Sequence, residues 1–115
     1  MKTFEMKTVI HFGDNALDRL AELPYKRVLV ITDPFIAKGK MIELITDPLR
    51  RGGKEFEVFS DVVPDAPVGK IAEGVKKFLE YQPEVVVAVG GGSAIDSSKA
   101  IREFALKLSL IHISE

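Results

Sequence analysis

The residues with the clearest potential for chemistry form one run near the end of the 115-residue chain. Three glycines, Gly90, Gly91 and Gly92, are followed directly by Ser93 and join a very apolar segment to a helical pattern. Glycines let the backbone approach a ligand closely, and the first N–H groups of a helix are unpaired and favour an anion. The run therefore predicts a phosphate or pyrophosphate site. A tight turn with Ser93 as a plain N-cap would explain the same residues without a ligand.

The spacing of this run differs from the two commonest nucleotide motifs. Ile95 occupies the third glycine position of G-x-G-x-x-G, and no Gly-Lys-Ser/Thr follows the glycines. Asp96 and Lys99 lie one helical turn apart after Ser93. They could form an i,i+3 ion pair on a solvated face, or Asp96 could lie near the sugar or nicotinamide side of a bound dinucleotide.

Two further acidic residues, Asp33 and Asp65, could also contact a ligand. Asp33 comes directly after the apolar run 27–32. At such a place in a dinucleotide fold, an acid accepts hydrogen bonds from the adenosine ribose and repels a 2′-phosphate. An Asp-Pro turn capping the next segment would explain Asp33 equally well. Asp65 lies between Pro64 and Pro67 and either faces the ligand or precedes the first turn of a helix.

The elements that must position these residues alternate along the chain. Runs of apolar or alternating residues predict strands, and apolar positions at helical spacing predict helices. A proline at position 48 indicates a kink, or a second short helix capped by Asp47. Such alternation predicts an α/β fold with a largely parallel sheet, whose ligands bind at the carboxyl ends of the strands. The predicted strands are 8–12, 27–32, 55–59 (an edge strand) and 84–89, and the predicted helices are 16–23, 38–51, 68–81 and 93–108.

Composition limits the class of protein. Hydrophobic residues make up 46% and charged residues 29%, as in an ordinary soluble domain or a piece of a larger one. A net charge of -1 argues against nucleic-acid binding through bulk charge. The absence of cysteine excludes disulfides, thiol nucleophiles and cysteine metal sites. No apolar run is long enough for a membrane span and no secretory signal is visible, so we expect a cytoplasmic protein.

Four segments of the chain resemble segments of the iron-containing (type III) alcohol dehydrogenases, and they occur in the same order as in that family. The resemblance is strongest to the butanol and 1,3-propanediol dehydrogenase branch. The resemblance covers about residues 8–104. It implies a Rossmann-like, doubly wound and mostly parallel sheet, the incomplete N-terminal half of a dehydroquinate synthase-like fold. The glycine motif alone also resembles glycerol dehydrogenase and dehydroquinate synthase. The four segments are His11-Phe12-Gly13, Val30 to Phe35, Phe59 to Pro67, and the Gly-Gly-Gly-Ser-x-x-Asp-x-x-Lys motif of residues 90–99.

The resemblance implies a nicotinamide cofactor whose pyrophosphate lies on Gly91, Gly92 and Ser93. It places Asp33 near the adenosine ribose, which favours NAD over NADP. Asp65 stands where relatives often carry an asparagine near the cofactor. The cofactor-binding residues expected on this basis are Asp33, Asp65, Gly90, Gly91, Gly92, Ser93, Asp96 and Lys99.

The resemblance also implies that the catalytic metal ligands of the family lie in a domain that this chain does not contain. Members of the family interconvert primary alcohols and aldehydes by hydride transfer, and hold iron through an Asp and three His of a second, helical domain. His11 and His112 do not match those ligands, so we expect no catalytic or metal-binding residue in this chain. We therefore expect an inactive cofactor-binding fragment whose full-length parent forms a homo-oligomer. A stand-alone nucleotide- or phosphate-binding module and a fragment of a glycerol dehydrogenase-like enzyme remain as alternatives.

The last residues differ in character from the rest. The segment 108–115 neither continues the preceding helical pattern cleanly nor resembles the family, and is similar to translated sequencing-adapter read-through. We expect residues 1–107 to form a partial dinucleotide-binding domain and residues 108–115 to be a non-native tail. A genuine divergent end is the alternative.

Overall fold

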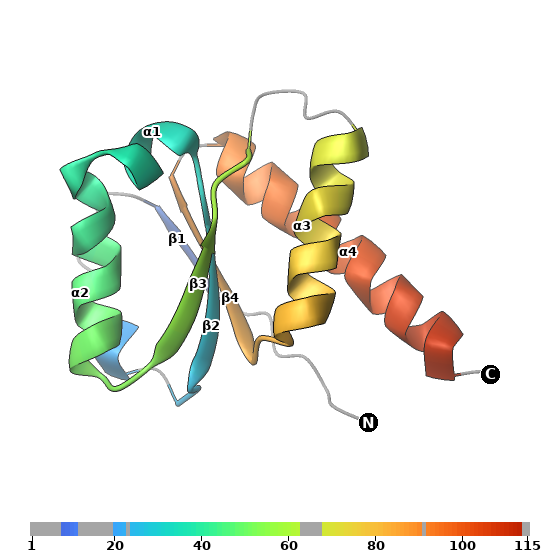
Figure 1. Ribbon diagram of the computed structural model, residues 1–115, viewed down its shortest axis with the longest axis horizontal. Coiled ribbons are helices and arrows are strands. Elements are labelled where there is room, and N and C mark those ends of the chain that lie inside the picture. The colour runs from blue at the N-terminus through green and yellow to red at the C-terminus, as the bar shows by residue number, and fades with distance from the viewer. Residues whose placement is uncertain (1–7, 12–19, 23, 63–67, 91, 114–115) are drawn as a thin grey trace.

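The computed structural model describes residues 8–11, 20–22, 24–62, 68–90 and 92–113, and the side chains within 20–22, 24–62, 68–90 and 94–108. These residues form a parallel sheet between two layers of helices (Figure 1). The strands are β1 (Thr8–His11), β2 (Arg27–Thr32), β3 (Glu55–Phe59) and β4 (Val85–Gly90).

The described strands pair in the order β1-β4-β2-β3, and every pair is parallel. All six residues of β4 are buried, because this strand lies inside the sheet and helices cover both of its faces. The edge strand β3 keeps its side chains partly exposed, as the alternating pattern of residues 55–59 predicts. The α/β fold with a parallel sheet is therefore confirmed.

The helices divide between the two faces of the sheet. Helix α1 (Pro34–Lys38), the 3₁₀ turn η2 (Lys40–Ile42) and α2 (Glu43–Arg51) lie on one side, and α3 (Val68–Tyr81) and α4 (Gly92–Ile113) lie on the other (Figure 1). Each layer closes its own apolar core. The first cluster contains Leu20, Val28, Val30, Ile36, Ile45, Leu49, Val85, Val87 and Val89. The second contains Leu29, Ile31, Val62, Val75, Phe78, Val86, Ala94, Ile101 and Ala105.

The segment 38–51 differs from its prediction. The predicted helix is interrupted at Gly39, whose extended backbone ends α1. Helix α2 is then continuous through Pro48. The predicted second helix capped by Asp47 is therefore wrong. Pro48 is buried in the core layer, so tertiary packing outweighs the loss of one helical hydrogen bond.

Two further boundaries shift. Helix α4 extends to Ile113, beyond the predicted end near residue 108, and the expectation that residues 108–113 do not continue the helix is wrong. Of the predicted helix 16–23, residues 20–22 form a 3₁₀ turn, and residues 16–19 and 23 lie outside the described part of the chain.

The path of the chain marks one place at the carboxyl ends of the strands. After β2 the chain enters the α1–α2 layer, whereas after β4 it enters α4 on the opposite face. Because β2 and β4 are neighbours, their carboxyl ends form a topological switch point, where ligands of open α/β sheets bind.

Gly74 lets α3 pack closely against the rest of its layer. A Cβ at this position would lie 2.2 Å from Ile101 Cδ1 of α4 and 3.2 Å from Phe59 Cε2 of β3. We expect Gly74→Ala to destabilise the fold by about 1–2 kcal/mol, because overpacking outweighs the gain in helix propensity. Urea denaturation followed by circular dichroism measures this change.

The same helix supplies a matched control. At Gly69 an added Cβ meets nothing within 4 Å, so Gly69→Ala should leave stability unchanged or raise it by up to about 1 kcal/mol. An Ile101→Val background removes Cδ1 and should reduce the cost of Gly74→Ala. Equal effects of the two alanine variants would contradict this account.

Candidate cofactor site

The carboxyl edge, which consists of residues 32–33 at the end of β2, residues 89–90 at the end of β4 and residue 92 at the start of α4, brings two predicted site residues together. Asp33 Oδ1 accepts a hydrogen bond of 2.8 Å from the backbone N–H of Ile36 and so caps α1. The other carboxylate oxygen, Oδ2, lies 3.1 Å from where a Cβ of residue 90 would stand. The capping role proposed for Asp33 is confirmed, and its second oxygen is turned toward the glycine turn.

Gly90 ends β4 in a conformation that few other residues adopt. Its φ is +137°, in the region where a side chain is strained. A Cβ there would also meet Ala94 Cβ at 3.5 Å and Ile36 Cδ1 at 3.6 Å. The glycine therefore satisfies both a backbone requirement and a spatial one at the point where β4 turns into α4.

A buried hydrogen bond joins the two strands immediately before these residues. Thr32 Oγ1 donates to the carbonyl oxygen of Val89 at 2.7 Å, and both residues are fully buried. Thr32 and Val89 are also register partners in the β2–β4 ladder. From the sequence, residue 32 is only the last position of the predicted strand 27–32, and no role was predicted for its hydroxyl. The sequence feature that could have indicated this bond is a hydroxyl on the last residue of an otherwise apolar strand.

Helix α4 begins at Gly92, so its unpaired N–H groups lie next to the end of β4. Residues 92 and 93 form its first turn, and their side chains lie outside the described part. Small or apolar residues hold the helix against the sheet, because Ala94, Ser97, Ser98, Ile101 and Ala105 are buried. Gly91 and Asp65 lie outside the described residues.

Asp96 and Lys99 lie on the other side of α4. Both side chains are exposed, and among the described residues no ion pair joins them. The i,i+3 pair that the spacing permits is therefore not formed. The structure places both residues on the exposed face of α4.

Comparison with known proteins identifies the family. The family model for iron-containing alcohol dehydrogenase matches residues 7–113. This chain belongs to the iron-containing alcohol dehydrogenase family. The match extends beyond residue 104, where the resemblance found in the sequence ends, to the last described residue of α4.

Relatives within the family are considerably longer. A 1-propanol dehydrogenase of Citrobacter freundii is 34% identical over 112 residues, which are 94% of this chain and 30% of that protein. A long-chain-alcohol dehydrogenase of Geobacillus thermodenitrificans is 39% identical over 93 residues, 77% of this chain and 24% of that protein. The iron-containing alcohol dehydrogenase structure from Thermococcus thioreducens superposes with a TM-score of 0.73 at 29% identity, over 90% of this chain and 28% of that one. This chain thus spans about 30% of the first of these relatives.

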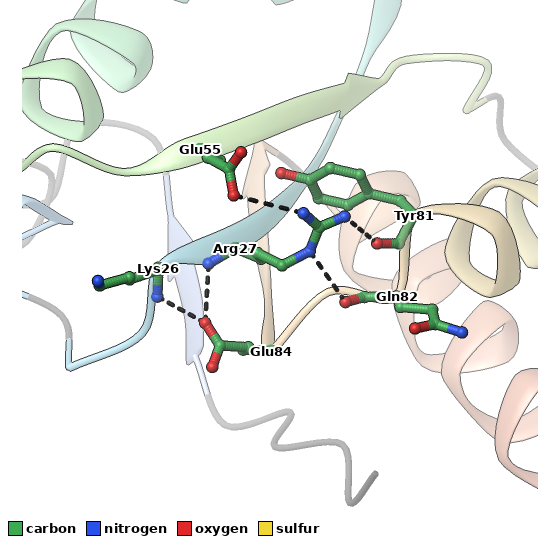
Figure 2. Close-up of polar contacts among 6 residues, drawn as sticks. All are labelled: Lys26, Arg27, Glu55, Tyr81, Gln82 and Glu84. Atoms are coloured by element: carbon green, nitrogen blue, oxygen red, sulfur yellow. Dashed lines mark hydrogen bonds and ion pairs between the residues drawn. The ribbon is translucent and has the colours of Figure 1, made fainter.

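The amino end of the sheet in this family member carries a polar cluster around Arg27, shown in Figure 2. The Arg27 guanidinium donates to the carbonyl oxygens of Tyr81 and Gln82, pairs with Glu55 at 3.3 Å and lies 4.3 Å from the centre of the Tyr81 ring. Glu84 Oε1 accepts from the backbone N–H groups of Lys26 and Arg27 at 2.7 and 2.9 Å. These contacts fix the starts of β2, β3 and β4, opposite the candidate site.

The loop after β3 is tied to α3 by an ion pair. Lys70 Nζ lies 2.8 Å from Asp61 Oδ2 and 3.9 Å from Glu73 Oε2. Further along α3, Lys77 pairs with Glu57 at 2.6 Å. The charged residues of this helix are therefore not simply a solvated face, because two lysines connect it to β3 and to the loop that follows.

Other features of the described residues lie away from the carboxyl edge. An apolar groove of about 600 Å³ runs along the outside of α3 and α4 and is lined by Val68, Ile71, Ala72, Val75, Lys76, Leu79, Glu80, Phe104 and Leu108. None of the predicted site residues lines it. Within the described residues, no helix is both long and apolar enough to cross a membrane. Nor do three or more His, Cys, Asp or Glu side chains of that part gather where they could hold a metal ion.

Replacing Gly90 tests the conformation of the edge. We expect Gly90→Ala to destabilise the fold by about 2–3 kcal/mol, because alanine is strained at φ +137° and its Cβ would press on the Asp33 carboxylate. Gly53→Ala is the matched control, since φ is +69° there but nothing lies within 4 Å of the added Cβ. Its cost should be about 1 kcal/mol. Urea denaturation that gives Gly90→Ala the smaller cost would disprove the spatial argument.

The Asp61–Lys70 pair predicts a pH dependence. The hydrogen bond and charge of Lys70 hold the pKa of Asp61 below its ordinary value of 3.8. The same pairing raises the pKa of Lys70 above 10.5. A carboxyl with a lowered pKa stabilises the fold above its unfolded pKa and loses that contribution as pH falls through the folded pKa.

We therefore expect Lys70→Met to be less stable than the unmodified chain at pH 6, with the difference shrinking as pH falls below 3.8. Urea denaturation at a series of pH values measures this difference. Lys76→Met, on the same helix, is the control and should show no such trend. A difference that stays constant down to pH 2.5 would rule out Asp61 as the titrating partner.

Proposed function

We propose that this chain is the cofactor-binding part of a longer iron-dependent alcohol dehydrogenase and that its carboxyl edge binds a nicotinamide dinucleotide. One observation carries the proposal. Asp33 and Gly90, far apart in sequence, meet at the switch point between β2 and β4, beside the first turn of α4. Membership of the family supports the same assignment.

The chemistry of the edge suits the two ends of such a cofactor. The backbone of Gly91, Gly92 and Ser93 would hold the pyrophosphate, because the first N–H groups of α4 are unpaired and the helix dipole favours an anion. Gly90 supports this by leaving the space a Cβ would occupy. Asp33 would accept hydrogen bonds from the adenosine ribose with Oδ2, because Oδ1 is already used by the cap.

The remaining predicted residues would lie further along the cofactor. Asp96 and Lys99 are exposed on α4 and free to meet the sugar or nicotinamide side of the ligand. Asp65 lies outside the described residues, in the segment between Asp61 and α3. These three assignments rest on the family motif and remain predictions.

We propose NAD rather than NADP as the cofactor. Relatives of both kinds exist: a butanol dehydrogenase of Thermotoga maritima is described as NADH-dependent, and one of Clostridium saccharobutylicum as NADPH-dependent. The choice must therefore depend on individual residues. A half-buried Asp33 carboxylate at the ribose position would repel a 2′-phosphate, which favours NAD.

When bound, the nicotinamide would carry the hydride exchanged between a primary alcohol and its aldehyde. The residues of this chain would bind and orient the cofactor. The described residues do not fit a metal site, so we propose that the iron ligands and the alcohol pocket belong to a part of the enzyme beyond these residues. The cytoplasmic location, the homo-oligomeric parent and the non-native tail 108–115 remain predictions.

Calorimetric titration of NAD and NADP into the purified chain tests the proposal. Asp33→Asn keeps a good N-cap but removes the charge, and should weaken NAD binding about tenfold while improving the relative affinity for NADP. Ser93→Ala should weaken both cofactors by roughly fivefold. Asp47→Asn, on α2 and away from the edge, is the control and should bind as the unmodified chain does.

Two results would contradict the proposal. One is a chain that binds neither cofactor, whether folded or unfolded by circular dichroism at saturating NAD. The other is NAD binding that Asp33→Asn and Ser93→Ala leave unchanged, which would put the ligand somewhere other than the carboxyl edge.

A further inference from the structure

We propose that Thr32 is a positioning residue that sets the preference for NAD over NADP. Its hydroxyl would act through Asp33, by fixing the end of β2 against the end of β4. The inference rests on the proposed function and adds to it the group that holds the discriminating carboxylate in place.

The Thr32 hydrogen bond is well suited to this task. Its hydroxyl reaches the carbonyl oxygen of Val89 at 2.7 Å, across a sequence separation of 57 residues. Neither residue has any exposed surface, so water cannot take the place of either partner. A carbonyl oxygen has two lone pairs, and this side-chain bond therefore adds to the backbone ladder between β2 and β4.

Both partners are directly joined to the residues of the edge. Thr32 precedes Asp33, and Val89 precedes Gly90, so any movement between the two strand ends passes to the site. The cap to Ile36 restrains one oxygen of Asp33 relative to α1, but it does not restrain α1 relative to β4. The Thr32–Val89 bond holds the end of β2, from which Asp33 continues, against the end of β4.

The presence of a hydroxyl here needs a reason beyond core filling. The position is fully buried at the end of a strand whose preceding residues, 28–31, are valine, leucine, valine and isoleucine. Valine has the same shape as threonine and suits a buried strand, whereas a buried hydroxyl is costly unless it is hydrogen-bonded. The polar group is therefore explained by the link it makes.

Discrimination by charge depends on distance. The repulsion between a carboxylate and a 2′-phosphate weakens as their separation grows and as water enters between them. The Asp33 carboxylate lies within 3.1 Å of the space that Gly90 leaves open, so a small shift of β2 changes its exposure and its distance from a ligand. A loosened strand end would thus reduce selectivity more than it reduces binding.

The test is calorimetric titration of NAD and NADP into the chain and its Thr32→Val and Thr32→Ser variants. Thr32→Val keeps the shape and loses the bond, and should lower the ratio of NAD to NADP affinity roughly fivefold or more. Thr32→Ser keeps the hydroxyl and should stay within about twofold of the unmodified ratio. In an Asp33→Asn background, Thr32→Val should leave the ratio unchanged, because no charge remains to be positioned.

The outcomes separate this inference from the proposed function. If the unmodified chain prefers NAD but Thr32→Val weakens both cofactors equally, Thr32 has only a structural role and the inference fails alone. If Thr32→Val does not fold, Thr32→Ala, which also lacks the hydroxyl, decides: a lowered ratio supports the inference, and an unchanged ratio overturns it. If the unmodified chain binds neither cofactor, the proposed function fails and this inference fails with it.

Discussion

The parallel pairing of β2 and β4 is the constraint on which the rest of the structure depends. Nearly every residue of these two strands is buried, so apolar helices must cover both faces of the sheet. The chain meets this need by leaving β2 toward α1 and α2 and leaving β4 toward α4. The same arrangement opens a switch point at the carboxyl ends, which makes the site a consequence of how the core is covered.

Polar contacts fix β2 against β4 at both ends of this pair of strands. Apolar packing alone would do little to set the register between them. At the amino end, Arg27 and Glu84 connect the starts of the strands to the end of α3. At the carboxyl end, the Thr32 hydroxyl reaches across to Val89. An apolar strand could slide without large loss of burial, whereas these directional bonds exist in one register only. The geometry of the site is therefore anchored from both sides.

The charged groups at the site differ in how firmly they are held. Asp33 is half-buried, capped onto α1 and placed against Gly90, whereas Asp96 and Lys99 are exposed on the outer side of α4. Restrained groups suit recognition of a fixed part of a ligand, because little freedom is lost when the ligand binds. The chain spans 30% of the Citrobacter freundii relative and 24% of the Geobacillus thermodenitrificans relative.

Most of the helices and strands, and the side chains available for chemistry, follow from local sequence pattern. Apolar runs and helical spacing depend on neighbouring residues, so β2, β3 and α3 were predicted with the observed bounds. The predicted glycine turn of residues 90–92 is only partly tested, because Gly90 belongs to β4, Gly92 begins α4 and residue 91 lies outside the described part. Asp33 was identified by its position after a buried strand. The break at Gly39, rather than at Pro48, was missed because burial of Pro48 in the core outweighs its local cost.

Which of these residues meet depends on how the strands and helices pack. The approach of Asp33 to Gly90, the bond from Thr32 to Val89 and the cluster around Arg27 all join residues far apart in the chain. Each contact depends on β4 lying beside β2 and on the register between the two strands. Contacts between distant residues set this register, so it cannot be predicted from local sequence pattern. Local pattern also could not tell that Asp96 and Lys99 lie on the exposed face of α4, because the buried face of this helix follows from how it packs on the sheet.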